Sequence, residues 1–221
     1  MHIGLIGGIG PAATVAYYTR LVAAFRAAGV PLELTIVHAD VAVLGQNIEA
    51  DQRAAQAEIF ARHIQQLKAA GCDVATITAL SGHFCFAETE AISALPLVNP
   101  ITLVDDYCRA NDVKVLGLLG SDTVMETRLF GQVQASRLVV PDGDLGRLGD
   151  IYMDMAMSGV CSEDSRKVLI DAGAAMVRDG ADAVLLAGTD LGLAFYDQNV
   201  GYPVIDALEI HVDGLLAMAT V

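Results

Sequence analysis

Residues 73–84 read DVATITALSGHF and decide the class of the fold. The first half of this stretch, residues 73–78, is an apolar run that predicts a buried strand. Glycine and polar residues follow it, and a helix-like segment carries Glu88 and Glu90. In an open α/β sheet, polar groups at the carboxyl end of a central strand line the crevice where ligands bind. This strand end is therefore the first candidate for a functional site.

A second stretch repeats the pattern. Residues 184–190 read VLLAGTD, again an apolar strand that ends in small and polar residues. Strand-like runs occur along the whole chain, at residues 2–6, 32–37, 73–78, 96–98, 113–119, 182–187 and 203–205. Segments of helical periodicity separate most of them. Near-continuous apolar strands with helical crossovers predict a mainly parallel sheet covered on both faces.

The order of these elements predicts two similar halves. The turn LGSDT at residues 119–123 has the position of the first glycine turn: a strand, a glycine and then a polar helix cap. We expect an α/β fold of two pseudo-symmetric parallel-sheet halves with the site between them. Residues 1–103 with 206–221 form the first half, and residues 104–205 form the second. The interface of two such halves is a usual place for a small-molecule site.

The composition restricts the partners. The chain has 221 residues, 54% of them hydrophobic, and a net charge of −14 without a basic cluster. This balance argues against nucleic acid and anionic membrane as partners. The sequence shows neither an apolar stretch long enough for a bilayer nor a signal peptide, so we expect a cytoplasmic protein. The four cysteines share no CxxC spacing and never cluster with histidine, so we expect reduced thiols and no metal.

The first glycine turn, residues 7–14 (GGIGPAAT), is the first candidate anion site. Gly8 lets the backbone approach a ligand, and Thr14 is a short donor beside it. A plain tight turn is the alternative. The glycine spacing differs from the dinucleotide fingerprint, so we expect no nucleotide cofactor. Arg53, near the start of a later helix, either points into the crevice or belongs to a solvated face.

Five more residues are candidates for holding a substrate anion. Four of them lie at the turns after strands: Ser81, Gly82, Thr123 and Thr189. The fifth is Arg166, which follows the capping residue Ser162 in the first turn of a helix. A cation does not suit that end of the helix dipole, so a ligand anion is one reason for it and simple exposure is the other.

Several stretches together resemble the aspartate/glutamate racemase superfamily, in order and over nearly the whole chain. They are IGLIGGIGPAAT at 3–14, SGH at 81–83, ME at 125–126, AGTD at 187–190, PVID at 203–206 and IH at 210–211. The resemblance implies two pseudo-symmetric α/β halves with the active site between them, a small-molecule carboxylate substrate, no cofactor, and a homodimer or higher homo-oligomer.

The resemblance also implies two catalytic cysteines, one in each half and one on each face of the substrate α-carbon. Here Ala79 and Gly188 occupy those positions, and Leu80 replaces an asparagine. The chain is thus similar to a divergent member that lacks both catalytic cysteines. We expect no appreciable racemization of aspartate or glutamate. Cys85 is a poor substitute because it lies where the chain should already enter a helix.

Three residues remain as candidates for proton transfer. His83 titrates near neutral pH and could act as general acid or base, or it could fix the loop. Asp190 replaces the glutamate of the related motif, or it caps a helix. Asp40 precedes an apolar segment, and burial there would raise its pKa and make it a base; a cap is the alternative. A metal held by His38, Asp40 and His83 is a further alternative.

These observations predict a cofactor-independent enzyme acting on a small carboxylate or related carbonyl compound. Its acid/base chemistry would not use cysteine, and its reaction would be of the isomerase or lyase type. A catalytically inactive paralogue that binds small carboxylates is the alternative, and a scaffold with a vestigial pocket is the third. Leu80 and the Met-rich segment 151–157 hint at a substrate less polar than aspartate. Core filling is the simpler account of the Met-rich segment.

Overall fold

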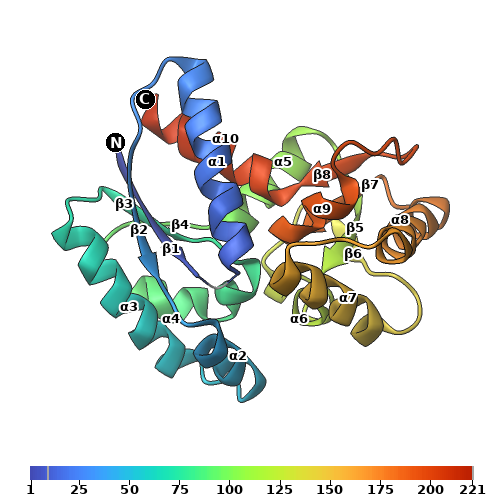
Figure 1. The fold of residues 1–221 in the computed structure, drawn as a ribbon, viewed down its shortest axis with the longest axis horizontal. Coiled ribbons are helices and arrows are strands. Elements are labelled where there is room, and N and C mark those ends of the chain that lie inside the picture. The colour runs from blue at the N-terminus through green and yellow to red at the C-terminus, as the bar shows by residue number, and fades with distance from the viewer. Residues whose placement is uncertain (9, 221) are drawn as a thin grey trace. The chain divides into compact units, whose positions relative to one another are not determined.

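The computed structural model describes residues 1–8 and 10–220, so Ile9 of the first glycine turn lies outside the described part. The chain divides into two compact units. The first contains residues 1–99 and 212–221, and the second contains residues 100–211. Figure 1 shows the elements of both units. None of the described helices combines the length and hydropathy that a bilayer crossing requires.

The first unit is built on a four-stranded sheet in which every strand pair is parallel. The strands are β1 (His2–Gly7), β2 (Glu33–His38), β3 (Val74–Ile77) and β4 (Leu97–Val98), in the order β2-β1-β3-β4. The helices are α1 (Pro11–Ala28), α2 (Val41–Glu49), α3 (Arg53–Ala69), α4 (Phe86–Ile92) and the 3-10 segment η1 (Leu80–Cys85). Helix α1 lies on one face of the sheet and α3 on the other (Figure 1).

Burial explains why these residues form these elements. Every residue of β3 is buried, as an interior strand of a sheet covered on both faces requires. Helix α1 buries a stripe that recurs every four residues, namely Ala13, Tyr17, Leu21 and Phe25. Strand β1 carries Gly4 where α3 packs, and a Cβ there would lie 2.8 Å from Leu67. The helices therefore cover both faces closely and leave the carboxyl edge to the loops.

The second unit repeats this arrangement. Its strands are β5 (Val115–Gly120), β6 (Arg137–Val139), β7 (Ala183–Ala187) and β8 (Val204–Asp206), all paired in parallel in the order β6-β5-β7-β8. Its helices are α5 (Pro100–Ala110), α6 (Asp122–Glu126), α7 (Leu145–Ser158), α8 (Glu163–Arg178) and α9 (Gly192–Phe195), with 3-10 segments η2 (Leu129–Gly131) and η3 (Thr189–Leu191). Helix α10 (Ala207–Ala219) begins in this unit and ends in the first.

The prediction of two parallel-sheet α/β halves is confirmed. In each unit the first strand pairs with the second on one side and the third on the other, and the fourth lies beyond the third. The sequence-based assignment missed one strand, β6 (Arg137–Val139). This strand has three residues and pairs with β5 alone, so it lacks the long apolar run that marks an interior strand.

Candidate functional site

The carboxyl ends of β1 and β3 lie side by side in the first unit. Ile6 pairs with Ile77 in the parallel register, so the turns that follow the two strands leave the same edge of the sheet. Thr78 joins them, since its backbone N–H and its hydroxyl both donate to the carbonyl of Ile6, at 3.1 Å. The turns that follow β1 and β3 are thus adjacent within this unit.

The first glycine turn is held by its own hydrogen bonds. The hydroxyl of Thr14 accepts from the N–H of Gly8 at 2.8 Å and donates to the carbonyl of Gly10 at 3.3 Å. Gly8 has φ +89°, and a Cβ there would lie 2.5 Å from Nδ1 of His38. An anion contact from Thr14 would compete with its bond to Gly10. Gly8 is required both for backbone conformation and for the closeness of His38.

The η1 segment after β3 carries Ser81, Gly82 and His83. Ser81 is half-buried, and its hydroxyl has no hydrogen-bond partner within residues 1–8 and 10–220. It is therefore available to a ligand. Gly82 is buried, and a Cβ there would lie 2.9 Å from Cγ2 of Ile77. Gly82 thus serves the packing of the segment against its own strand.

His83 is almost completely buried, with 1% of its surface exposed. Its Nδ1 lies 3.0 Å from the carbonyl of Ala79, so Nδ1 carries the proton, and its ring stacks on Phe86. Burial lowers the pKa of His83 to about 4, against the smaller raising effect of the hydrogen bond to Ala79. At neutral pH His83 is a neutral imidazole that ties the loop to its own strand end.

The sequence left two roles open for Asp40, a buried base or a helix cap. Asp40 is exposed, as is His38. Its carboxylate caps α2 by accepting from the N–H of Ala42 at 2.8 Å. The cap is thus the role that Asp40 has, because the apolar residues after it form the helix that it caps and do not cover it. Within the described residues, no three His, Cys, Asp or Glu side chains are grouped as metal ligands.

Arg53, at the start of α3, is paired with a neighbour in the chain. Its Nε lies 2.7 Å from Oδ1 of Asp51, and about half of its side chain is exposed. The hydrogen bond to Asp51 raises the pKa of Arg53. Asp51 has φ +47°, so the pair closes the sharp turn between α2 and α3. The pair with Asp51 explains why an arginine occupies position 53, and no ligand contact is needed to explain it.

The second unit brings together the ends of β5 and β7. Gly120 pairs with Ala187 in the register, and a Cβ at Gly120 would lie 2.8 Å from the carbonyl of Ala187. Ser121 caps the short helix α6 by accepting from Val124. The hydroxyl and the N–H of Thr123 both donate to Oδ1 of Asp122, its neighbour in the turn. The two turns are thus adjacent, and Thr123 is engaged within its own turn.

A buried carboxyl lies at the end of β7. Asp190 is 5% exposed, and burial raises its pKa, against the lowering effect of a hydrogen bond from the hydroxyl of Tyr152. That hydroxyl lies 3.4 Å from Oδ2 of Asp190. Thr189 is half-buried, and no hydrogen bond of its hydroxyl is found among the described residues. Among the three proton-transfer candidates, Asp190 is thus the one that is buried and whose pKa is raised.

Tyr152 is the residue that sequence reasoning overlooked. It lies on α7, and a Cβ at Gly188 would be 2.5 Å from its Cε2 atom. The Met-rich helical pattern of residues 151–157 indicated a pocket wall or core filling. It carried no sign of which side chain reaches a strand end distant in sequence. The aromatic residue among the methionines was the one signal available.

Arg166 has internal partners. Its Nη1 donates to the carbonyls of Leu193 and Ala194, each at 3.2 Å, and its Nε lies 3.4 Å from Oε1 of Glu163. Both carbonyls belong to α9, a helix of four residues whose carbonyl groups need donors. Arg166 therefore joins α8 to α9, which explains a cation near the start of α8.

The cysteines are poor nucleophiles. Cys72, Cys85 and Cys108 are buried, and Cys161 is intermediate. Burial raises the pKa of Cys85 to about 11, although a hydrogen bond with Thr89 lowers it. A thiol with that pKa is protonated at neutral pH, so it is neither a base nor a nucleophile there.

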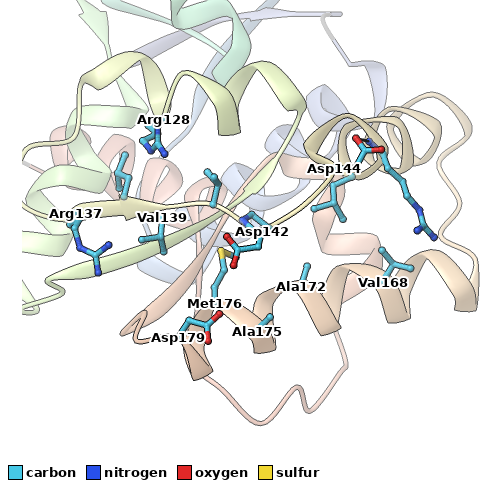
Figure 2. Close-up of a pocket in the computed structure, with 15 residues that line it drawn as sticks. Arg128, Arg137, Val139, Asp142, Asp144, Val168, Ala172, Ala175, Met176 and Asp179 are labelled. Carbon is cyan, nitrogen blue, oxygen red and sulfur yellow. Dashed lines mark hydrogen bonds between the residues drawn. The ribbon is translucent and has the colours of Figure 1, made fainter.

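The second unit also has a cleft of about 580 Å³ away from these strand ends (Figure 2). It is lined by residues of β6, α7 and α8 and the loops beside them, including Arg137, Asp142 and Met176. No predicted site residue lines it. Its size is typical of ligand pockets, but Asp190, the buried carboxyl with a raised pKa, does not line it. We therefore place the candidate site at the strand ends.

Comparisons with known proteins agree with this geometry. A family model described as Asp/Glu/Hydantoin racemase matches residues 6–215. The fold is similar to that of an aspartate racemase homologue from Pyrococcus horikoshii OT3, at 24% identity and TM-score 0.81, with 100% of this chain and 99% of that chain covered. Picrophilus torridus aspartate racemase has 22% identity and TM-score 0.74, with 100% and 95% covered. Arylmalonate decarboxylase has 18% identity and TM-score 0.58, with 99% and 92% covered.

Proposed function

Because this chain belongs to the Asp/Glu/Hydantoin racemase family, we propose that it is a cofactor-independent enzyme acting on a small carboxylate or related carbonyl compound. Its acid/base chemistry does not use cysteine, and its reaction is of the isomerase or lyase type. The observation that carries the proposal is Asp190, a buried carboxyl with a raised pKa at the carboxyl end of β7. A carboxyl whose pKa moves toward the working pH is a better general base and acid.

The chemistry that fits is proton transfer at the carbon next to a carboxylate. In the isomerase case the C–H bond breaks, its proton goes to a base, and the electron pair delocalises into the carboxylate as an enediolate. In the lyase case the bond to a second carboxyl group breaks, carbon dioxide leaves, and the acid protonates the carbon. The hydroxyl of Thr189, which has no partner among the described residues and lies next to Asp190 in the chain, is suited to donate to the charge that develops.

The other two candidates have weaker support. His83 has a pKa of about 4 and its one ring N–H is bonded to the carbonyl of Ala79, which supports a structural role. Asp40 is an exposed helix cap. Alanine at Asp190, His83 and Asp40, one at a time, separates the three, because only the base loses turnover while the fold is kept. The likeness of fold to arylmalonate decarboxylase supports including the lyase type.

The test uses four probes: L-aspartate, 2-phenylpropionate, methylmalonate and phenylmalonate. Proton NMR in D₂O follows exchange of the α-proton in the first two and loss of carbon dioxide from the last two. We expect reaction with at least one probe other than aspartate. Binding of malonate by calorimetry without reaction of any probe would favour the inactive carboxylate-binding paralogue. Absence of both binding and reaction would favour the scaffold.

A further inference from the structure

Tyr152 lies directly over Gly188 at the end of β7. A Cβ at position 188 would be 2.5 Å from Cε2 of Tyr152 and 2.7 Å from its hydroxyl oxygen. Gly188 has φ −171°, an extended conformation that any residue adopts. Space for the phenol, not backbone freedom, is therefore the reason for a glycine here. The glycine lets the hydroxyl approach a strand end that a side chain would cover.

The hydroxyl of Tyr152 contacts the buried carboxyl of Asp190. It donates to Oδ2 of Asp190 at 3.4 Å, and Tyr152 is half-buried while Asp190 is 5% exposed. The hydrogen bond is long, as catalytic hydrogen bonds of unliganded enzymes often are. Tyr152 is therefore the more exposed residue of the pair.

The packing of α7 fixes this geometry. One turn before Tyr152, a Cβ at Gly149 would lie 2.9 Å from Cβ of Asp122 in the turn after β5. One turn after it, Met155 and Ala156 are buried. The helix thus contacts both strand-end turns of the second unit, and the phenol is held in place. A catalytic group held in this way needs little reorganisation.

We propose that Tyr152 is a proton-transfer group of the enzyme and that it relays protons between the substrate carbon and Asp190. The inference rests on the proposed function and adds a residue and a route to it. In the forward step the substrate C–H bond breaks and its proton bonds to the hydroxyl oxygen of Tyr152. The proton that this hydroxyl carried passes to the Asp190 carboxylate. The electron pair remains on the substrate as an enediolate, and the reverse transfers return the proton.

This route avoids a charged tyrosine. A free phenolate next to a carboxylate would bring two negative charges together in a poorly solvated place, which is costly. In the relay the negative charge moves from Asp190 to the substrate, and Tyr152 stays neutral before and after the step. Asp190 must be ionised to accept the proton, so the forward rate rises with pH through the pKa of Asp190.

The same unit contains a tyrosine, Tyr202, whose hydroxyl bonds a backbone carbonyl and, among the described residues, no carboxyl. Tyr202 packs against Gly173 of α8, and its hydroxyl donates to the carbonyl of Ile170 at 2.9 Å. It precedes β8, so it lies at the amino edge of the sheet, away from the strand ends. Tyr152 and Tyr202 share the ring-on-glycine packing but differ in the group that the hydroxyl meets. Tyr202→Phe is therefore the matched control for Tyr152→Phe.

The experiment compares wild type, Tyr152→Phe and Tyr202→Phe with two readouts. Carbon-13 NMR of labelled aspartate carboxyls gives the pKa of Asp190. Steady-state kinetics on the probe that wild type converts gives kcat, KM and the pH profile. We expect Tyr152→Phe to raise the pKa of Asp190, because it removes a hydrogen bond that lowers it. We also expect kcat to fall by about 10²–10⁴-fold with KM little changed. Tyr202→Phe should change neither.

The results distinguish failure of the relay from failure of the proposed function. An unchanged Asp190 titration in Tyr152→Phe would show that the pair does not exist in solution and would overturn the relay. Full kcat in Tyr152→Phe, with an active wild type, would overturn the relay while the proposed function stands. Wild type that converts none of the probes would count against the proposed function and remove the relay with it.

Discussion

A Cβ on Gly188 would lie 2.5 Å from Cε2 of Tyr152, so these two positions cannot both carry a side chain in the observed geometry. Their packing is a property of the second unit alone, because β7 and α7 both belong to it. Any substitution at position 188 must displace the phenol or the helix that bears it. The two residues are therefore expected to respond to mutation together.

Gly188→Ala should lower the free energy of unfolding by about 1–3 kcal/mol, the usual cost of overpacking. Tyr152→Ala opens the space, so adding Gly188→Ala to that variant should cost much less, and a double-mutant cycle should give a clear coupling energy. Urea denaturation of the single and double variants measures this coupling energy. Gly45→Ala is the control, since a Cβ there has open space within a helix and should be neutral or stabilising. Additive effects of the two site substitutions would contradict the observed packing.

Asp190→Asn should raise the melting temperature at neutral pH. Burial raises the pKa of Asp190 in the folded state, so the folded protein holds the proton more tightly than the unfolded chain. The resulting stabilisation is present below the ordinary aspartate pKa and is lost as pH rises through the raised value. The gain from asparagine should accordingly vanish in acid, which calorimetry at several pH values measures. An Asp190→Asn variant that is less stable than wild type at every pH would refute this prediction.

His83 should make the fold sensitive to acid. Its pKa is about 4 in the folded state against an ordinary value of 6.5, so the unfolded chain takes up the proton first. The stability present above pH 6.5 is lost as pH falls through 4, by roughly 3 kcal/mol at 1.36 kcal/mol per pKa unit. His83→Gln should lack this part of the pH dependence in urea titrations. His63→Gln, on helix α3, serves as the control, and equal pH slopes in wild type and His83→Gln would contradict the burial effect.

Racemization of aspartate and glutamate should be absent or very slow. Ala79 and Gly188 stand where the resemblance places two thiols, and neither can move a proton. Removal of a general acid or base lowers rates by about 10²–10⁴-fold per group. Proton NMR in D₂O shows exchange of the α-proton, and chiral chromatography shows the enantiomer. Robust racemization of either amino acid would overturn the assignment of these two positions.

Activity should survive alkylation by iodoacetamide. Cys85 is buried and its pKa is raised to about 11, and Cys72 and Cys108 are buried as well. Only the thiolate reacts, so labelling of the native protein should be confined mainly to Cys161. Mass spectrometry of the native and the urea-unfolded protein locates the labels. Loss of activity that tracks labelling of Cys85 would show that this thiol takes part in the chemistry.

Local patterns account for the elements that the sequence predicted. Interior strands such as β3 and β7 are buried along their whole length, and burial on both faces leaves a continuous apolar run in the sequence. The glycine turns at Gly8 and Gly120 mark strand ends because close backbone approach requires a residue without a side chain. Strand β6 escaped prediction because a three-residue edge strand leaves no such run.

The sequence by itself determined the α/β class, the two parallel sheets and the strand ends at which polar residues gather, because these follow from periodicity and from glycine. Only the tertiary structure decided which polar residues are buried. Asp40 and Asp190 each follow an apolar strand, yet the first is an exposed cap and the second is 5% exposed. The difference comes from α7. Its Tyr152 contacts Gly188 and Asp190, which follow it in the chain by 36 and 38 positions. Burial and pKa depend on such contacts between distant segments, and no local pattern records them.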